Sequence, residues 1–136
     1  MSHYISEHIK QLVRKRAKNC CEYCRLNQAD SFMPFEVDHI LSLRHDGTTV
    51  SANLALSCPT CNRFKAADIG TFLDGNLRFV RLFHPRKDSW DDHFEVNKGE
   101  IVPLTRIGRA TVKLLNLNDP DRIILRQVLI AVGRYP

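Results

Sequence analysis

Four of the five cysteines occur in two pairs that have metal-binding spacing. Cys21 and Cys24 form one Cys-x-x-Cys unit, and Cys58 and Cys61 form another. Two such units are typical of a structural zinc ion held by four thiolates. Disulfide bridges are the alternative, but the N-terminal residues do not resemble a secretion signal, so zinc is favoured. Cys20 could replace Cys21 as a ligand, although Cys21 keeps the usual gap of two residues.

Polar residues that bind metals or accept protons lie between and just after these pairs. Asp38 and His39 are adjacent, Asn53 precedes the second pair, and Asn62 directly follows it. The order Cys-x-x-Cys, Asp-His, Asn-Leu, Cys-x-x-Cys-Asn-x-x-Lys resembles the HNH endonuclease family, in its subgroup with a four-cysteine zinc site. The resemblance covers residues 21–65, and the nested order of its motifs makes it specific.

The resemblance implies an α+β fold with a ββα-metal (His-Me finger) nuclease core and a four-cysteine zinc site. It implies that His39 is the general base and that Asn53 orients it. It further implies that Asp38 and Asn62 bind a catalytic divalent cation. Asn62 stands where the family has His or Asn.

The chemistry of phosphodiester hydrolysis agrees with these residue types. A neutral imidazole such as that of His39 can accept a proton from water, and a divalent cation can stabilise the charge on the phosphate. Oxygen ligands from Asp38 and Asn62 favour Mg²⁺ or Mn²⁺. Because one Asp supplies a single negative charge, we expect weak metal binding until DNA phosphate oxygens complete the shell. Successive strand residues face opposite sides, so the Asp-His pair must lie at a strand end.

The charge balance favours a polyanionic partner. Twenty Lys and Arg residues against fifteen Asp and Glu residues give a formal net charge of +5, and cations that neutralise phosphates release counterions from DNA. Arg63 and Lys65 follow Asn62 on an expected helix, where they would contact phosphates next to the cut. A purely solvated role is the alternative for both.

Elements that could position this site are visible in the sequence. Ser6 is expected to cap a helix that ends near Asn19, residues 35–43 are expected to form a strand, and Pro59 suits the first turn of a helix through residues 62–67. Zinc would fasten the end of the first helix to the start of the second. Such a link matters because a module of about 60 residues has little core.

The chain is predicted to divide into a nuclease module over residues 1–69 and a C-terminal extension over residues 70–136. Within the extension we expect a turn at residues 74–76, one hairpin from strands 93–96 and 100–104, and two final helices, about 105–115 and from Asp119 onward. The extension is expected to pack on the module and is a candidate source of further DNA contacts.

Taken together, these features predict a metal-dependent endonuclease that acts on DNA. No apolar run approaches the roughly 18 residues of a membrane span, so we expect a cytoplasmic protein without membrane contact. The alternative is a catalytically inactive zinc-ribbon module that binds DNA. The presence of Asp38, His39, Asn53 and Asn62 favours the enzyme, because a module that had lost catalysis would not need all four.

Overall fold

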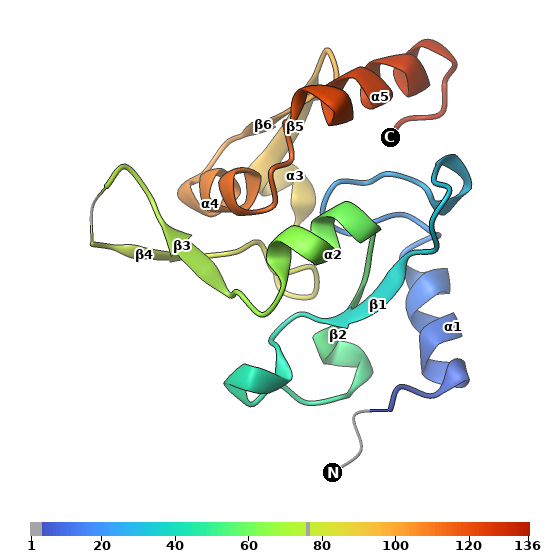
Figure 1. Ribbon diagram of the computed structural model, residues 1–136, viewed down its shortest axis with the longest axis vertical. Coiled ribbons are helices and arrows are strands. Elements are labelled where there is room, and N and C mark those ends of the chain that lie inside the picture. The colour runs from blue at the N-terminus through green and yellow to red at the C-terminus, as the bar shows by residue number, and fades with distance from the viewer. Residues whose placement is uncertain (1–3, 76) are drawn as a thin grey trace.

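The computed structural model describes residues 4–75 and 77–136, and its chain has mixed α/β structure. Within these residues three antiparallel two-stranded sheets alternate with helices (Figure 1). The elements are α1 (Glu7–Arg16), β1 (Glu36–His39), β2 (Leu54–Ser57), α2 (Pro59–Lys65), β3 (Gly70–Phe72), β4 (Phe79–Arg81), α3 (Trp90–His93), β5 (Phe94–Asn97), β6 (Glu100–Pro103), α4 (Arg106–Leu114) and α5 (Pro120–Ala131), with 3₁₀ turns at Gln28–Asp30, Leu43–His45 and Ser51–Asn53.

Helix α1 begins and ends close to the predicted positions. The Ser6 hydroxyl accepts a hydrogen bond from the Ile9 amide, which satisfies one free N–H of the first turn. At the other end, the guanidinium of Arg16 donates to the carbonyl oxygens of Ser51 and Leu54, at 3.0 and 2.8 Å. The helix is thereby tied to the start of β2.

Strands β1 and β2 pair antiparallel, with Asp38 opposite Ala55 and His39 opposite Leu54. Strand β2 is buried throughout and leads directly into α2, which begins with Pro59 as expected. In Figure 1, α2 lies between this β-hairpin and the C-terminal elements. The N-terminal half therefore places a helix at the end of a hairpin.

The first strand is shorter than predicted, because it ends at His39 rather than near residue 43. The side chain of Asn53 takes over the pairing beyond that point. Its Oδ1 accepts from the Leu41 amide and its Nδ2 donates to the Leu41 carbonyl, both at 2.9 Å. A side-chain amide thus replaces the partner strand, and the chain can leave the sheet immediately after His39.

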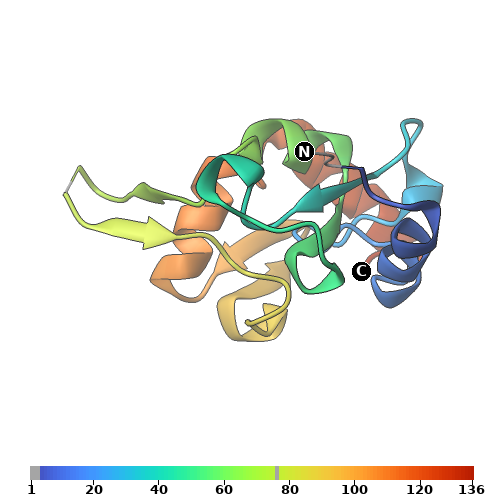
Figure 2. The same ribbon diagram turned by 90° about the horizontal axis from the view of Figure 1, so that it is seen from below.

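The C-terminal half contains the expected hairpin and two helices, and also two elements that were not predicted. Helices α4 and α5 begin after Thr105 and Asp119, whose side chains accept hydrogen bonds from their first turns. The extra elements are the short helix α3 and the hairpin β3–β4, which projects from the rest of the molecule (Figures 1 and 2). Asn76, which belongs to the turn predicted at residues 74–76, lies outside the described residues.

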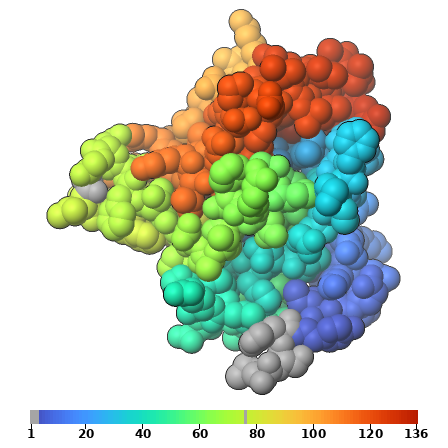
Figure 3. All heavy atoms as spheres, viewed as in Figure 1, coloured from blue at the N-terminus to red at the C-terminus, as the bar shows by residue number. Residues whose placement is uncertain are grey.

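Both halves contribute to one hydrophobic core. Val13 and Leu56 from the first half and Phe94 and Leu117 from the second belong to the same buried cluster. The space-filling view shows the C-terminal helices, in orange and red, against the green segment that contains α2 (Figure 3). A boundary near residue 69 stays a prediction. None of the helices within residues 4–75 and 77–136 is both long and apolar enough to cross a bilayer.

Candidate metal centre and active site

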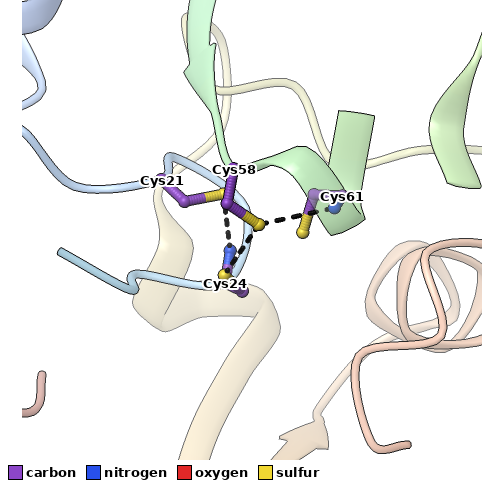
Figure 4. A group of neighbouring side chains, drawn as sticks. All are labelled: Cys21, Cys24, Cys58 and Cys61. Atoms are coloured by element: carbon purple, nitrogen blue, oxygen red, sulfur yellow. Dashed lines mark hydrogen bonds between the residues drawn. The ribbon is translucent and has the colours of Figure 1, made fainter. Parts of the chain in front are cut away.

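The four predicted cysteine ligands meet in one buried cluster. Cys21 and Cys24 come from the loop after α1, Cys58 caps α2, and Cys61 lies in its first turn (Figure 4). Their ligand atoms all lie within 4.8 Å of one another. Cys20 lies outside this group, where its Sγ accepts a hydrogen bond from Asn27. The four cysteines singled out by the Cys-x-x-Cys spacing therefore lie together.

The size of the cluster fits a zinc ion. A tetrahedral site with Zn–S bonds of about 2.3 Å separates its sulfurs by about 3.8 Å, and Cys24 Sγ lies 3.7 Å from Cys58 Sγ. All five cysteines are free thiols. In each pair a backbone amide also points at the first sulfur: Cys24 N–H toward Cys21 Sγ at 3.5 Å, and Cys61 N–H toward Cys58 Sγ at 3.4 Å. Four buried thiols so arranged could bind zinc.

A cation from the C-terminal half, Arg122, lies against this cluster and contributes to the charge state of Cys24. Hydrogen bonds from neighbouring thiols lower the pKa of Cys24 well below its usual value, and the charge of Arg122 contributes to that effect. Burial alone would lower the pKa of Arg122, but the thiolates of Cys61 and Cys24 raise it. Arg122 Nη2 lies 3.0 Å from Cys61 Sγ. Arg122 and the Cys24 thiolate therefore stabilise each other's charged forms, whereas burial raises the pKa of Cys21 and of Cys61.

His39 lies at the last position of β1, which meets the requirement that Asp38 and His39 sit at a strand end. Its Nε2 lies 2.9 Å from the hydroxyl oxygen of Thr49, with which it shares a hydrogen bond. The imidazole is half-buried. Thr49 belongs to the loop that returns the chain to β2, so this loop sets the orientation of the ring.

The side chain of Asn53 holds the same loop in place through hydrogen bonds to its backbone. It is buried, and besides its two bonds to Leu41 its Nδ2 donates to the Thr48 carbonyl oxygen at 2.8 Å. The Asn53 carbonyl accepts from the amide of Ile40. Asn53 therefore acts on the backbone on both sides of the His39–Thr49 pair.

Lys65 occupies a position that differs from the predicted one. Its side chain is only 2% exposed, so it is turned away from solvent and cannot serve as the surface phosphate contact expected from the sequence. Its Nζ donates to the His39 carbonyl oxygen at 3.1 Å and lies 3.8 Å from Asp38 Oδ2. Burial lowers the pKa of Lys65, while the Asp38 carboxylate opposes that shift. Lys65 thus holds the end of β1 from α2.

The two remaining predicted residues lie on α2 with different surroundings. Asn62 is half-buried and stands three residues before Lys65, so it shares the helix face that reaches β1. Arg63 is exposed, with its guanidinium carbon 5.1 Å from the centre of the Phe64 ring. Arg63 is therefore accessible to a ligand in solution, unlike Lys65.

A second cation would have few protein ligands. Among the described residues, the four cysteines are the one group of at least three His, Cys, Asp or Glu side chains close enough to share a metal. Asp38, with a side chain 30% exposed, could contribute one carboxylate, and Asn62 one amide oxygen. Water or phosphate oxygens would have to supply the rest.

Two residues of this region were not singled out from the sequence. Thr49 lies in the run Gly-Thr-Thr-Val, which has no distinguishing pattern. Arg122 was recognisable in principle, because it is a charged residue beside the apolar run Ile123-Ile124-Leu125. A cation in such a position often has a buried anionic partner.

The comparison with protein families agrees with the predicted resemblance. The model of the HNH endonuclease family matches residues 21–68, which contain both Cys-x-x-Cys pairs and His39. The match covers 48 of the 136 residues and agrees with the resemblance predicted from the motifs, and the four-cysteine cluster is consistent with the zinc subgroup. Comparisons with curated proteins and with solved structures gave no match.

Proposed function

We propose that this protein is a metal-dependent endonuclease that hydrolyses DNA phosphodiester bonds, with His39 as the general base. The observation that carries the proposal is the position of His39 at the end of β1, beside Asp38 and with its Nε2 bonded to Thr49. The succession β1, β2, α2 supports assignment to the ββα-metal nuclease fold, and the four-cysteine cluster supports a structural zinc ion.

The hydrogen bond to Thr49 suggests which imidazole nitrogen acts. If Nε2 carries the proton and donates to Thr49 Oγ1, then Nδ1 has a free lone pair. Nδ1 would take a proton from water while the water oxygen bonds to phosphorus and the bond to the 3′ oxygen breaks. The departing 3′ alkoxide takes a proton from solvent water, so the products would be a 5′-phosphate and a 3′-hydroxyl. Asn53 and Lys65 would hold the backbone of this site without contacting DNA.

Asp38 and Asn62 are the residues proposed to hold the catalytic cation, Mg²⁺ or Mn²⁺. When bound, the cation supplies charge stabilisation for the phosphate and the leaving oxygen. Arg63 is the proposed phosphate contact, since its side chain is exposed beside Asn62. Lys65 does not share this role, because its side chain is buried.

Plasmid cleavage tests the proposal. Wild-type protein with Mg²⁺ or Mn²⁺ is expected to nick or cut DNA, and His39→Ala is expected to bind DNA without cutting it. His45→Ala is a matched control, because His45 is an exposed histidine in the 3₁₀ turn after β1. If the wild type and His39→Ala both bind DNA but neither cuts it, the result would favour the inactive zinc-ribbon module.

A further inference from the structure

Arg122 links the C-terminal helices to the cysteine cluster through both ends of its guanidinium group. Nη2 donates to Cys61 Sγ at 3.0 Å and lies 3.9 Å from Cys58 Sγ. Nη1 donates to the carbonyl oxygens of Leu115 and Asn116, at 2.8 and 3.1 Å, where α4 ends. One side chain therefore joins the sulfurs to the connection between α4 and α5.

The charge of the cluster gives this contact its physical importance. Four thiolates around Zn²⁺ carry a net charge of −2, and the cysteines are buried. A buried negative charge needs hydrogen-bond donors or a nearby cation. The two backbone amides that point at Cys21 and Cys58 supply dipoles, whereas Arg122 supplies a full positive charge at a thiolate ligand.

Arg122 also borders an opening beside the sulfurs. A small cavity of about 70 Å³ is lined by Cys24 and Cys58 on one side and by Arg122 and Leu125 of α5 on the other. The guanidinium group of Arg122 thus lies beside a cavity where α5 does not pack fully against the cysteine cluster. A shorter side chain at position 122 would widen the path to the sulfurs.

We propose that Arg122 is an outer-shell residue of the zinc site, which sets how tightly the ion is held and couples its binding to the docking of α4 and α5. The inference rests on the proposed structural zinc. Hydrogen bonds to metal ligands commonly change metal affinity by about 10- to 100-fold when they are removed. Because linkage is reciprocal, zinc binding also stabilises the contact between α5 and the nuclease domain.

The experiment compares three variants of the full chain by Co²⁺ and Zn²⁺ competition titration at fixed pH. Arg122→Gln removes the charge and is expected to weaken metal affinity about 10- to 100-fold. Arg122→Lys keeps the positive charge but loses the guanidinium group that donates at both ends. Its metal affinity is expected to lie between those of the wild type and Arg122→Gln. Arg126→Gln is the matched control, since Arg126 is a buried arginine of α5 that borders the same cavity but donates to Gly99, Leu117 and Asn118 and not to a cysteine sulfur.

The possible results are distinguishable. Sulfur-to-cobalt charge-transfer absorption in the wild type reports four-thiolate binding, and its absence would overturn the zinc site and this inference together. Wild-type binding combined with equal affinities for Arg122→Gln and Arg126→Gln would overturn the role of Arg122 alone. If Arg122→Gln does not fold, Arg122→Lys is compared with the wild type instead. A metal affinity of Arg122→Lys equal to that of the wild type would contradict the proposal.

Discussion

Thr49 Oγ1 lies 2.9 Å from Nε2 of His39, so the ring of the proposed base is held by a hydroxyl from the loop that follows it. Thr49→Val keeps the shape of the side chain and removes the hydroxyl. We expect kcat for DNA cleavage to fall by roughly tenfold to a hundredfold, because the imidazole loses its fixed orientation and tautomer. KM should change little.

The neighbouring threonine provides the control for this prediction. Thr48 is exposed and contributes its carbonyl oxygen, not its hydroxyl, to the bond with Asn53. Thr48→Val should therefore cleave DNA at the wild-type rate. Equal losses in the two variants would mean that the loop tolerates no change, and that the bond to His39 has no separate effect.

Arg63 and Lys65 should differ in their effect on DNA binding. Arg63→Ala is expected to weaken binding to all sequences alike and to reduce the slope of log K against log salt by about 1. Lys65→Met should leave that slope unchanged, because the ammonium group is buried against His39 and Asp38. Fluorescence anisotropy with a labelled duplex at several salt concentrations measures the affinity and the salt slope of each variant.

The burial of Lys65 marks the limit of prediction from the sequence. The caps Ser6 and Asp119 predicted helix starts correctly, since capping depends on local side-chain chemistry. The paired cysteines predicted their own cluster because metal spacing is short and regular. Whether a lysine faces solvent depends on how α2 packs against β1, which no local pattern encodes.

The elements that were missed have a similar explanation. Strand β3 has three residues, and α3 has only four, so neither is long enough to show a hydrophobic period. Strand β1 was predicted too long because the apolar residues Ile40 and Leu41 continue its pattern. The side chain of Asn53 ends the strand instead, and a pairing between residues this far apart cannot be read locally.

Asn53→Asp should destabilise the fold while keeping the shape of the side chain. The carboxylate can still accept from the Leu41 amide, but it cannot donate to the carbonyls of Leu41 and Thr48. We expect the free energy of unfolding to fall by about 1–3 kcal/mol, measured by urea titration. Asn97→Asp is the control, since it adds the same charge at an exposed position. Similar losses of stability in both variants would mean that the added negative charge, and not the lost hydrogen bonds, causes the destabilisation.

Cys61→Ala should lose bound zinc and the cooperative thermal transition, because a small zinc module obtains much of its stability from the metal. Cys20→Ala should retain both, since Cys20 lies outside the cluster. Zinc content by atomic absorption and unfolding by circular dichroism make the comparison. Retention of stoichiometric zinc by Cys61→Ala would argue against a four-cysteine site.

Asp88 should contribute to acid stability. Hydrogen bonds from Arg81 lower its pKa from 3.8 to about 2, so the unfolded chain binds a proton between these values while the folded chain does not. Stability from this pair is therefore present above pH 4 and is lost as the pH falls toward 2. Asp88→Asn should be less stable than the wild type at pH 7, with the difference disappearing near pH 2. A constant difference across this range would contradict the assignment.

The hydroxyl of Tyr135 donates to the carbonyl oxygen of Cys24 across 111 residues of chain. During translation, the two cysteine pairs leave the ribosome well before the segment that covers them can reach its place. We therefore expect the nascent chain to acquire its ion while the thiols are still open to the surroundings. Metal exchange in the finished protein should then be much slower than first loading.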